Sequence, residues 1–320
     1  MANGTFIISL DFELHWGAAE KWDLNVKKGY FDATRKSIPV VLTLFEKYDI
    51  HATWATVGFL FAKDKAQLLE FCPKERPSYN NKALSYYSLI DNKEVGADEN
   101  DDPYHYAPSL IGEILKTPNQ ELGTHTFAHY YCNEPGQTKA QFAADLQAAR
   151  AIAKANFNVE LQSLVFPRNQ FNSDYLTIAK GNGIKTVRTN PDVWFWKTEA
   201  KTAAIARAFD TLLPISSTLT YEMPQVSANG ITMVPASRFL RPFTEKEKFI
   251  SNFKMSRIKS EMRHAAKHNR CYHLWWHPHN FGYSTEKNLE DLEEILKYFE
   301  LLKGEFGFES ATMIEMHSKL

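Results

Sequence analysis

Short apolar segments alternate with helix-like patterns along most of this chain, and this rhythm is the strongest constraint on its fold. Strand-like runs lie at residues 5–10, 52–60, 163–167, 185–189, 271–277 and near 308–314. Helix-like runs lie at residues 37–49, 138–156, 173–183, near 244–268 and 285–304. Such alternation favours βα units around a parallel sheet or barrel. In these folds active sites gather at the carboxyl ends of the strands, so polar residues that directly follow a strand are the candidates for chemistry.

Two segments interrupt this rhythm. Residues 63–120 are rich in Tyr, Asn and Asp and are too long for an ordinary βα loop, which predicts either a lid or a partly disordered excursion, with the lid preferred. Residues 191–243 carry aromatics and several prolines and predict a second irregular excursion. We therefore expect a single domain over residues 1–320 with insertions at about 63–120 and 191–243.

The composition excludes some classes of partner. The 37 basic residues are balanced by 38 acidic ones, which gives no global attraction to nucleic acid or to an anionic membrane. The sequence lacks a signal-like start and a run of 18 apolar residues, so we expect a soluble, cytoplasmic protein without membrane insertion. Cys72, Cys132 and Cys271 have no Cys-x-x-Cys spacing, which argues against a disulfide framework or a thiolate zinc site. Nothing in the composition predicts an oligomeric state.

The first strand-like segment ends in acidic residues, in "SLDFELHWG". Side chains alternate along a strand, so Asp11, Glu13 and His15 are expected on one face, with Phe12 and Leu14 on the other. One interpretation is a strand tip that points polar groups into water. The alternative is that carboxylates directly after a buried strand stay near the core, where their partners and pKa values serve chemistry.

Histidines four residues apart occur three times. His125 and His129, in "GTHTFAH", follow a glycine that is expected to close a short apolar strand. On one helical turn they would face the same way and bind one metal ion, with a carboxylate such as Glu13 as third ligand. A buried, hydrogen-bonded histidine pair is the other interpretation of this motif.

The other two pairs have different surroundings. His264 and His268 lie in "RHAAKHNR", whose positive charges oppose a divalent cation, so they predict a solvated basic helix face. His273 and His277 belong to the strand-like "HLWWHPHNF". His277 closes that strand before a proline, the position from which a βα barrel presents catalytic groups, whereas His273 lies too deep.

With "SLDFEL", "GTHTFAH" and "WWHPHNF" in place, the chain resembles the NodB-type polysaccharide deacetylases, which are carbohydrate esterase family 4-like enzymes. A second strand "HATWATVG" and an arginine-proline element "FPRNQF" complete five family elements in the correct order across residues 5–281. The resemblance implies an α/β fold, namely a distorted, seven-stranded (β/α) barrel with irregular insertions. It also implies a divalent metal, with Zn²⁺ as the expected ion, and hydrolysis of an N-acetyl group on a sugar.

The resemblance assigns metal and base roles residue by residue. The family usually has two adjacent acids in its first motif, whereas here Phe12 separates them. Asp11 is then the catalytic base and Glu13 a metal ligand, and alternation along the strand supports this because positions 11 and 13 share a face. His125 and His129 match the remaining two ligands.

The remaining assignments follow later motifs. Arg168 comes after the proline rather than before it and is expected to pair with Asp11, while Asp192, in "NPDVW", matches the acid that orients a catalytic residue. His277 matches the general acid, and His279 stays open as its alternative or as a substrate-binding residue. The rings that could stack on a sugar are Trp16, Tyr130, Trp194 and Trp275.

The expected substrate is an N-acetylated sugar of a bacterial surface polysaccharide or of its precursor, such as a sugar nucleotide or a lipid-linked intermediate. Two alternatives stay open. Relatives of this group hydrolyse C–N bonds of cyclic amides such as allantoin, and a catalytically silent module could bind a glycan. Nucleic-acid binding through the basic segment at 256–270 is disfavoured by the near-zero net charge.

Overall fold

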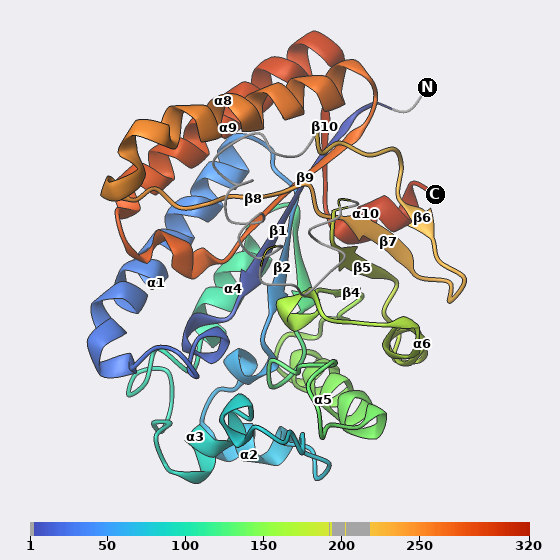
Figure 1. The fold of residues 1–320 in the computed structure, drawn as a ribbon. Coiled ribbons are helices and arrows are strands. Elements are labelled where there is room, and N and C mark those ends of the chain that lie inside the picture. The colour runs from blue at the N-terminus through green and yellow to red at the C-terminus, as the bar shows by residue number, and fades with distance from the viewer. Residues whose placement is uncertain (1–2, 192, 194–201, 203–217) are drawn as a thin grey trace.

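The strand-like segments pair into one strongly curled sheet that helices wrap from outside (Figure 1). The computed structural model describes residues 3–191, 193, 202 and 218–320. The strands of this part are β1 (Thr5–Phe12), β2 (Ala52–Thr56), β3 (Gln120–Thr124), β4 (Ser163–Leu164), β5 (Thr186–Thr189), β6 (Gln225–Val226), β7 (Thr232–Pro235), β8 (Arg238–Phe239), β9 (Cys271–Trp276) and β10 (Glu309–Ala311). Their order is β6-β7-β5-β4-β3-β2-β1-β9-β8, and β10 also pairs with β1.

Helices follow most strands. They are α1 (Leu24–Lys47), α2 (Lys65–Phe71), α3 (Tyr87–Asp91), α4 (Pro108–Lys116), α5 (Lys139–Phe157), α6 (Ser173–Gly181), α8 (Lys248–Lys267), α9 (Thr285–Phe306) and α10 (Met313–Ser318). Short 3-10 turns are η1 (Leu14–Gly17), η2 (Gly58–Phe61), η3 (Lys82–Leu84), η4 (Pro167–Asn169), η6 (Glu245–Glu247) and η7 (Pro278–Gly282).

The distorted barrel that the resemblance implied is confirmed. All strand pairs are parallel except β6 with β7. The sheet of the described residues has ten strands rather than seven, because short strands are added at its edges and β10 pairs beside the first half of β1.

The register brings the carboxyl ends of the strands to one rim. Phe12 pairs with Thr56, Thr56 with Thr124, and Thr124 with Leu164. On the other side of β1, Leu10 pairs with Trp276. The residues that directly follow β1, β3, β4 and β9 therefore meet at the same end of the barrel.

Inward-facing residues fill the barrel. Ile7, Ala55, Val165 and Val234 form a small apolar cluster inside it, and Met313 of α10 packs against this cluster. A much larger apolar cluster lies between the outer face of the sheet and the helices, with Phe6, Ile8 and Leu10 contributed by β1. The inward face of β1 becomes polar toward its end, at Ser9 and Asp11, and these two residues are buried as well.

Helix α1 begins well before its predicted start at residue 37. Asp23 caps its first turn, with its carboxylate accepting the backbone N–H of Asn25. Pro39 lies inside the helix. A serine two residues before a proline is typical of a helix start, which explains why the sequence predicted the start of this helix at residue 37.

The insertion at 63–120 packs against the barrel through α2, α3 and α4. Tyr86, Tyr87, Ile90 and Tyr106 are buried in the large apolar cluster. Its proposed motion as a lid stays a prediction. The insertion predicted at 191–243 contributes β6, β7 and β8, and residues 192, 194–201 and 203–217 of that segment lie outside the described residues.

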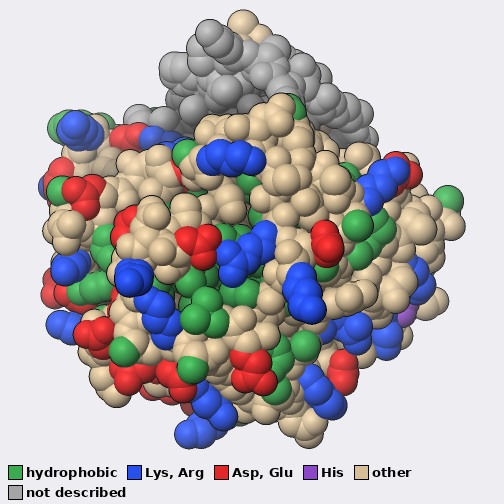
Figure 2. All heavy atoms as spheres, turned by 90° about the horizontal axis from the view of Figure 1, so that it is seen from below, with side chains coloured by type: hydrophobic (Ala, Val, Ile, Leu, Met, Phe, Trp, Pro, Cys, Tyr) green, Lys and Arg blue, Asp and Glu red, His purple; other side chains and the backbone are tan. Residues whose placement is uncertain are grey.

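Charges of both signs are interspersed on the face seen from below (Figure 2). This pattern agrees with the formal net charge of −1. Among the described residues, the helices are too short or too polar to cross a bilayer.

Candidate metal-dependent active site

Acids and histidines that follow β1, β3 and β9 converge on one pocket of about 320 Å³ at the carboxyl rim of the barrel. Asp11 and Glu13 come from the end of β1, His125 and His129 from the loop after β3, and His277 from the end of β9. We call this the acid–histidine pocket. The predicted common face of Asp11 and Glu13 is confirmed, but Leu14 turns with φ of 48° and carries His15 away from the pocket.

Glu13, His125 and His129 form a tight, buried cluster. The Nε2 atoms of His125 and His129 lie 3.0 and 3.1 Å from the same oxygen, Oε1 of Glu13. Burial would raise the pKa of the Glu13 carboxyl, but the positive charge that the nearby imidazoles carry when they are protonated, His277 first among them, holds that pKa well below its usual range. Glu13 is therefore ionised at neutral pH.

The tautomer of each ligand histidine follows from its other ring nitrogen. Nδ1 of His125 lies 2.7 Å from the carbonyl of Val165, which can only accept, so Nδ1 carries the hydrogen and Nε2 a lone pair. For His129, Nδ1 lies 3.0 Å from the hydroxyl of Tyr131.

That hydroxyl belongs to a chain that fixes its direction. Tyr86 donates its hydroxyl hydrogen to the carboxylate of Glu20, so it accepts from the hydroxyl of Tyr131, 2.9 Å away. Because Tyr131 donates its only hydroxyl hydrogen to Tyr86, its oxygen accepts the hydrogen bond from Nδ1–H of His129. Both histidines thus direct Nε2 lone pairs at Oε1 of Glu13.

Such a convergence of acceptors fits a cation. Two acceptor nitrogens lie 3.0 and 3.1 Å from a third acceptor, Oε1 of Glu13, with no hydrogen between either nitrogen and the oxygen, and the three ligand atoms lie within 4.8 Å of one another. Two imidazole nitrogens and one carboxylate oxygen are a donor set for a divalent transition metal, with positions left open for water and substrate. The hydrogen bonds on the outer nitrogens are of the kind that orients metal-bound histidines.

The loop that carries the two histidines is an irregular turn, so the helical turn expected from the sequence is wrong. Thr126 and His129 have positive φ values of 65° and 53°. The carboxylate of Asp145, on α5, accepts the backbone N–H groups of Phe127 and Ala128 at 2.6 and 3.0 Å. Burial raises the pKa of Asp145 to about 7, although these two N–H groups act in the opposite direction.

Asp11 forms a bidentate ion pair with Arg188. Nη1 and Nη2 of Arg188 lie 2.6 and 2.7 Å from the two carboxylate oxygens, and both side chains are buried. Arg188 also contacts Ser9 and Asn169 and stacks on the ring of Trp275. Burial would raise the pKa of Asp11, but the charge of Arg188 holds it below its usual value.

The prediction that Arg168 pairs with Asp11 is therefore wrong. Arg168 lines the pocket but binds Glu20 at 2.8 Å and Glu134 at 3.0 Å, and its guanidinium covers the ring of Tyr131. Arg168 and Asn169 have positive φ values of 55° and 52°, so the backbone turns irregularly within η4. Arg188 could have been found in the sequence, because it is a charged residue in the middle of the strand "TVRT".

His277 and His279 lie side by side at the rim, with ring centroids 4.9 Å apart. Nε2 of His277 lies 3.8 Å from both Asp11 and Glu13, and its side chain is 26% exposed to the pocket. His279 is more buried, with Nδ1 3.9 Å from Oε2 of Glu13. Burial, together with the neighbouring His277, lowers the pKa of His279 to about 3, so His279 is neutral.

The sequence model of the polysaccharide deacetylase family matches residues 24–187, slightly more than half of the 320 residues. The chain belongs to the polysaccharide deacetylase family. This match includes His125 and His129, whereas Asp11, Glu13 and His277 lie outside it and are placed by the structure. A search of curated proteins finds no match.

Solved structures share the fold of this deacetylase-family chain. A putative polysaccharide deacetylase from Mycobacterium smegmatis superposes with a TM-score of 0.63 at 11% identity, covering 99% of this chain and 90% of that one. A probable polysaccharide deacetylase from Pseudomonas aeruginosa PAO1 gives 0.58 at 9% identity, with the same coverages. Puue allantoinase gives 0.56 at 10% identity, covering 99% and 90%.

The aromatic predictions for this family member have mixed outcomes. Trp16 and Tyr130 are fully buried, with Trp16 donating to the carbonyl of His105 and Tyr130 bonded to Gln137, so the prediction that they face a sugar is wrong. Trp275 and His279 line the pocket as predicted. Tyr131 and Trp22 line it too and were missed. Asp192 and Trp194 lie outside the described residues.

The other histidine pairs lie apart from the pocket. His264 bonds Thr220, and His268 is exposed. His273 is buried below the pocket, where Nε2 lies 2.8 Å from the hydroxyl of Ser9. Burial lowers the pKa of His273 to about 3, so it acts as a neutral packing residue.

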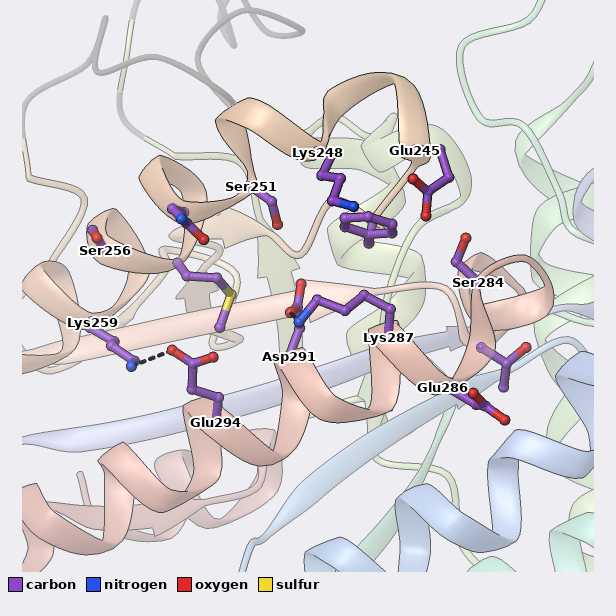
Figure 3. A pocket seen from close by; sticks show the side chains of 14 residues that line it. Glu245, Lys248, Ser251, Ser256, Lys259, Ser284, Glu286, Lys287, Asp291 and Glu294 are labelled. Carbon is purple, nitrogen blue, oxygen red and sulfur yellow. Dashed lines mark hydrogen bonds and ion pairs between the residues drawn. The ribbon is translucent and has the colours of Figure 1, made fainter.

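A larger cavity of about 930 Å³ lies between α8 and the start of α9 (Figure 3). Among the described residues that line it there is no histidine or cysteine, and two of its lysines are paired, with Lys259 2.6 Å from Glu294 and Lys287 3.0 Å from Asp291. It shares no residue with the acid–histidine pocket. The larger volume therefore does not mark the centre of the chemistry.

Proposed function

We propose that this chain is a metal-dependent hydrolase that removes the N-acetyl group from a sugar of a surface polysaccharide or of its precursor. The observation that carries the proposal is the buried convergence of His125, His129 and Glu13, with Asp11 and His277 beside it. This arrangement combines a cation site with a candidate base and a candidate acid. A silent binding module would need neither of the last two.

Glu13, His125 and His129 would hold the metal, and Zn²⁺ is the ion that their donor set favours. When bound, a divalent ion polarises a carbonyl oxygen and lowers the pKa of water. Tyr131 and the carbonyl of Val165 keep the two imidazoles in the tautomer that binding requires.

Asp11 takes the proton of the attacking water. Arg188 occupies one lone pair on each carboxylate oxygen and keeps Asp11 ionised, and the remaining lone pairs stay free to accept a proton. As oxygen adds to the acetyl carbon, the C–N bond breaks and acetate leaves the sugar nitrogen.

His277 gives the departing nitrogen its proton. Its side chain is partly open to the pocket, and its Nδ1 has no hydrogen-bond partner among the described residues. The neutral His279 packs beside it and is suited to accept a hydrogen bond from substrate rather than to donate a proton. This contrast favours His277 over His279 as the general acid.

The rings of Trp22, Tyr131 and Trp275 line the pocket and suit a sugar. We further propose that the substrate is met in the cytoplasm, which would favour a polysaccharide precursor. A cyclic amide, such as the substrate named for Puue allantoinase, is the alternative within the same chemistry.

Acetate release separates these functions. Purified protein loaded with Zn²⁺ is expected to release acetate from at least one member of a panel of N-acetylated sugars, oligosaccharides and sugar nucleotides. Chelation should abolish the release and Zn²⁺ should restore it. Hydrolysis of allantoin without acetate release from any sugar would contradict the proposal.

A further inference from the structure

A buried carboxylate interrupts the largely apolar inner face of α5. Asp145 is fully buried, and the same face of the helix carries the core residues Phe142, Leu146 and Ala149. Among the described residues its carboxylate has no cationic partner. Burial of such a group costs stability, and two backbone N–H groups offset this cost only in part, because the pKa of Asp145 stays raised, at about 7. A charge retained at this cost points to a role beyond helix packing.

The two N–H groups belong to the turn that joins the histidines of the metal cluster. One carboxylate oxygen accepts the N–H of Phe127 at 2.6 Å, and the other accepts the N–H of Ala128 at 3.0 Å. Successive N–H groups that point to one place form an anion-binding concavity in the backbone. Asp145 fills this concavity with both oxygens, so it fixes two adjacent peptide groups of the turn.

The opposite side of the turn has no room to move. The backbone N–H of Gly58 donates to the carbonyl of Thr126 at 2.8 Å. The next N–H, of Phe59, donates to the carbonyl of Phe127 at 3.0 Å. A Cβ atom at position 58 would lie 2.6 Å from Cα of Phe127, so only glycine allows the two backbones to approach this closely. The turn is therefore held between η2 on one side and Asp145 on the other.

The geometry of the metal cluster depends on this turn. His125 directly follows β3, and its N–H still donates to the carbonyl of Thr56 in β2, at 2.9 Å. His129 is connected to β3 only through the turn. Both Nε2 atoms nevertheless lie 3.0 and 3.1 Å from the same oxygen of Glu13. A shift of the turn would move His129 relative to the other two ligands.

We propose that Asp145 is a positioning residue for the metal site, because it holds the turn in the conformation that directs Nε2 of His129 at Oε1 of Glu13. Asp145 does not line the acid–histidine pocket, so it acts through the backbone of the turn and not on substrate. This role rests on the proposed function for the identity of the metal cluster, and it adds a residue on which the affinity for the ion depends.

Asp145→Asn tests the role with the smallest change of shape. An amide has one acceptor oxygen, and its NH₂ group would face an N–H group of the turn, so one of the two hydrogen bonds is lost. We expect the affinity for Zn²⁺, measured by competition with a chromogenic chelator, to fall by about 10- to 100-fold. The rise in unfolding temperature that Zn²⁺ produces should shrink in parallel, because a tighter ligand stabilises the folded state more.

Glu121→Gln is the matched control. Glu121 lies near the start of β3, the strand that leads to the turn, and burial raises its pKa as well. Its carboxylate accepts from the hydroxyl of Thr53 at 2.7 Å and from the backbone N–H of Ile314 at 3.2 Å. These contacts lie at the end of β3 away from the metal cluster. The variant should lower the unfolding temperature of the metal-free protein and leave the affinity for Zn²⁺ unchanged.

Two results would overturn the positioning role. One is a native affinity for Zn²⁺ in Asp145→Asn, and the other is an equal loss of affinity in Glu121→Gln. If Asp145→Asn fails to fold by circular dichroism, Asp145→Glu keeps the charge and both acceptors but displaces them by one methylene group. Its affinity should fall too, and a native value in that variant would overturn the role as well.

Failure of this role and failure of the proposed function give different results. Metal binding is measured without substrate, so a selective loss of affinity in Asp145→Asn, without acetate release from any sugar, would support the positioning role and refute the deacetylase activity. Acetate release with native affinity in Asp145→Asn would refute the positioning role alone. A native protein that binds no divalent ion would refute both.

Discussion

Arg188 and Asp11 stand 177 positions apart in the sequence and form a bidentate ion pair inside the barrel. The pair links the end of β1 to β5, on the side of the sheet away from solvent. Because the guanidinium lowers the pKa of Asp11, it sets the pH range in which Asp11 can act as a base.

Replacement of Arg188 should therefore change the pH profile. In Arg188→Met the pKa of Asp11 is expected to rise, so the acid limb of kcat shifts to higher pH and turnover near pH 6 falls by at least about tenfold. Loss of one partner of a buried pair also costs on the order of 3–5 kcal/mol of stability, so thermal unfolding must be recorded in parallel.

Arg168→Met is the control for this experiment. Arg168 is part of the same pocket but pairs with Glu20 and Glu134, and its side chain is 32% exposed. Its replacement should leave the acid limb where it was. An unshifted limb in Arg188→Met, or an equal shift in both variants, would show that Arg188 does not govern the base.

Metal content tests the Glu13–His125–His129 cluster directly. The native protein is expected to bind about one divalent ion per chain, and His125→Ala with His129→Ala should abolish binding. The double variant His264→Ala with His268→Ala should retain the ion, because that pair lies on α8 and its end and belongs to neither of the two possible metal-ligand groups among the described residues. Elemental analysis after dialysis gives the stoichiometry, and equal metal loss in both double variants would contradict the assignment.

The hydrogen-bond chain from Glu20 through Tyr86 and Tyr131 to His129 makes a sharper prediction. Tyr86→Phe removes the hydroxyl that sets the direction of this chain, so His129 loses its fixed tautomer, and metal affinity should fall by about 10- to 100-fold. Tyr87→Phe is the matched control, since the buried hydroxyl of Tyr87 has no partner among the described residues. Competition with a chromogenic chelator measures both affinities, and equal values for the two variants would refute the chain's role.

The alternation of strands and helices sufficed to predict βα units around a parallel sheet or barrel, and the family resemblance added the distorted barrel. The strand ends sufficed for most of the pocket. Asp11, Glu13, His125, His129 and His277 all follow apolar strands in the sequence, and parallel strands bring their carboxyl ends together. These residues could be found because the end of a strand, which is visible in the sequence, also lies at the rim of the barrel where the pocket forms.

Other parts of the site depend on contacts that no local pattern encodes. Arg188 reaches Asp11 through the barrel interior, whereas Arg168, which the altered arginine-proline element suggested as the partner of Asp11, turns toward Glu20. Tyr130 and Tyr131 are neighbours in sequence, but the irregular turn around His129 buries the first and brings the second to the pocket. Which residue of each pair reaches the pocket depends on tertiary packing, and the spacing of residues in the sequence carries no information about that packing.

Two substitutions test the separate roles of Asp11 as the base and Glu13 as the metal ligand. Asp11→Asn should retain the metal and lose at least about a hundredfold in turnover, because an amide cannot take the proton of water. Glu13→Ala should instead weaken metal binding, since its Oε1 lies within 3.1 Å of both histidines. Metal loss in Asp11→Asn with retention in Glu13→Ala would reverse the two roles.

His277 and His279 make the last prediction, because both face the acids and only one can serve as the general acid. His277 lies 3.8 Å from Asp11 and Glu13 and is partly exposed, whereas burial lowers the pKa of His279 to about 3. A general acid must be protonated when substrate is bound, which a histidine with such a low pKa is not at neutral pH. His277→Ala should therefore reduce kcat by roughly a hundredfold or more and remove the alkaline limb of the pH profile, with metal content unchanged. His279→Ala should raise KM and keep the alkaline limb, because its loss removes a contact to substrate rather than a proton. If His279→Ala lost the alkaline limb while His277→Ala kept it, the proton would come from position 279, and the burial of that ring would have to be relieved when substrate binds.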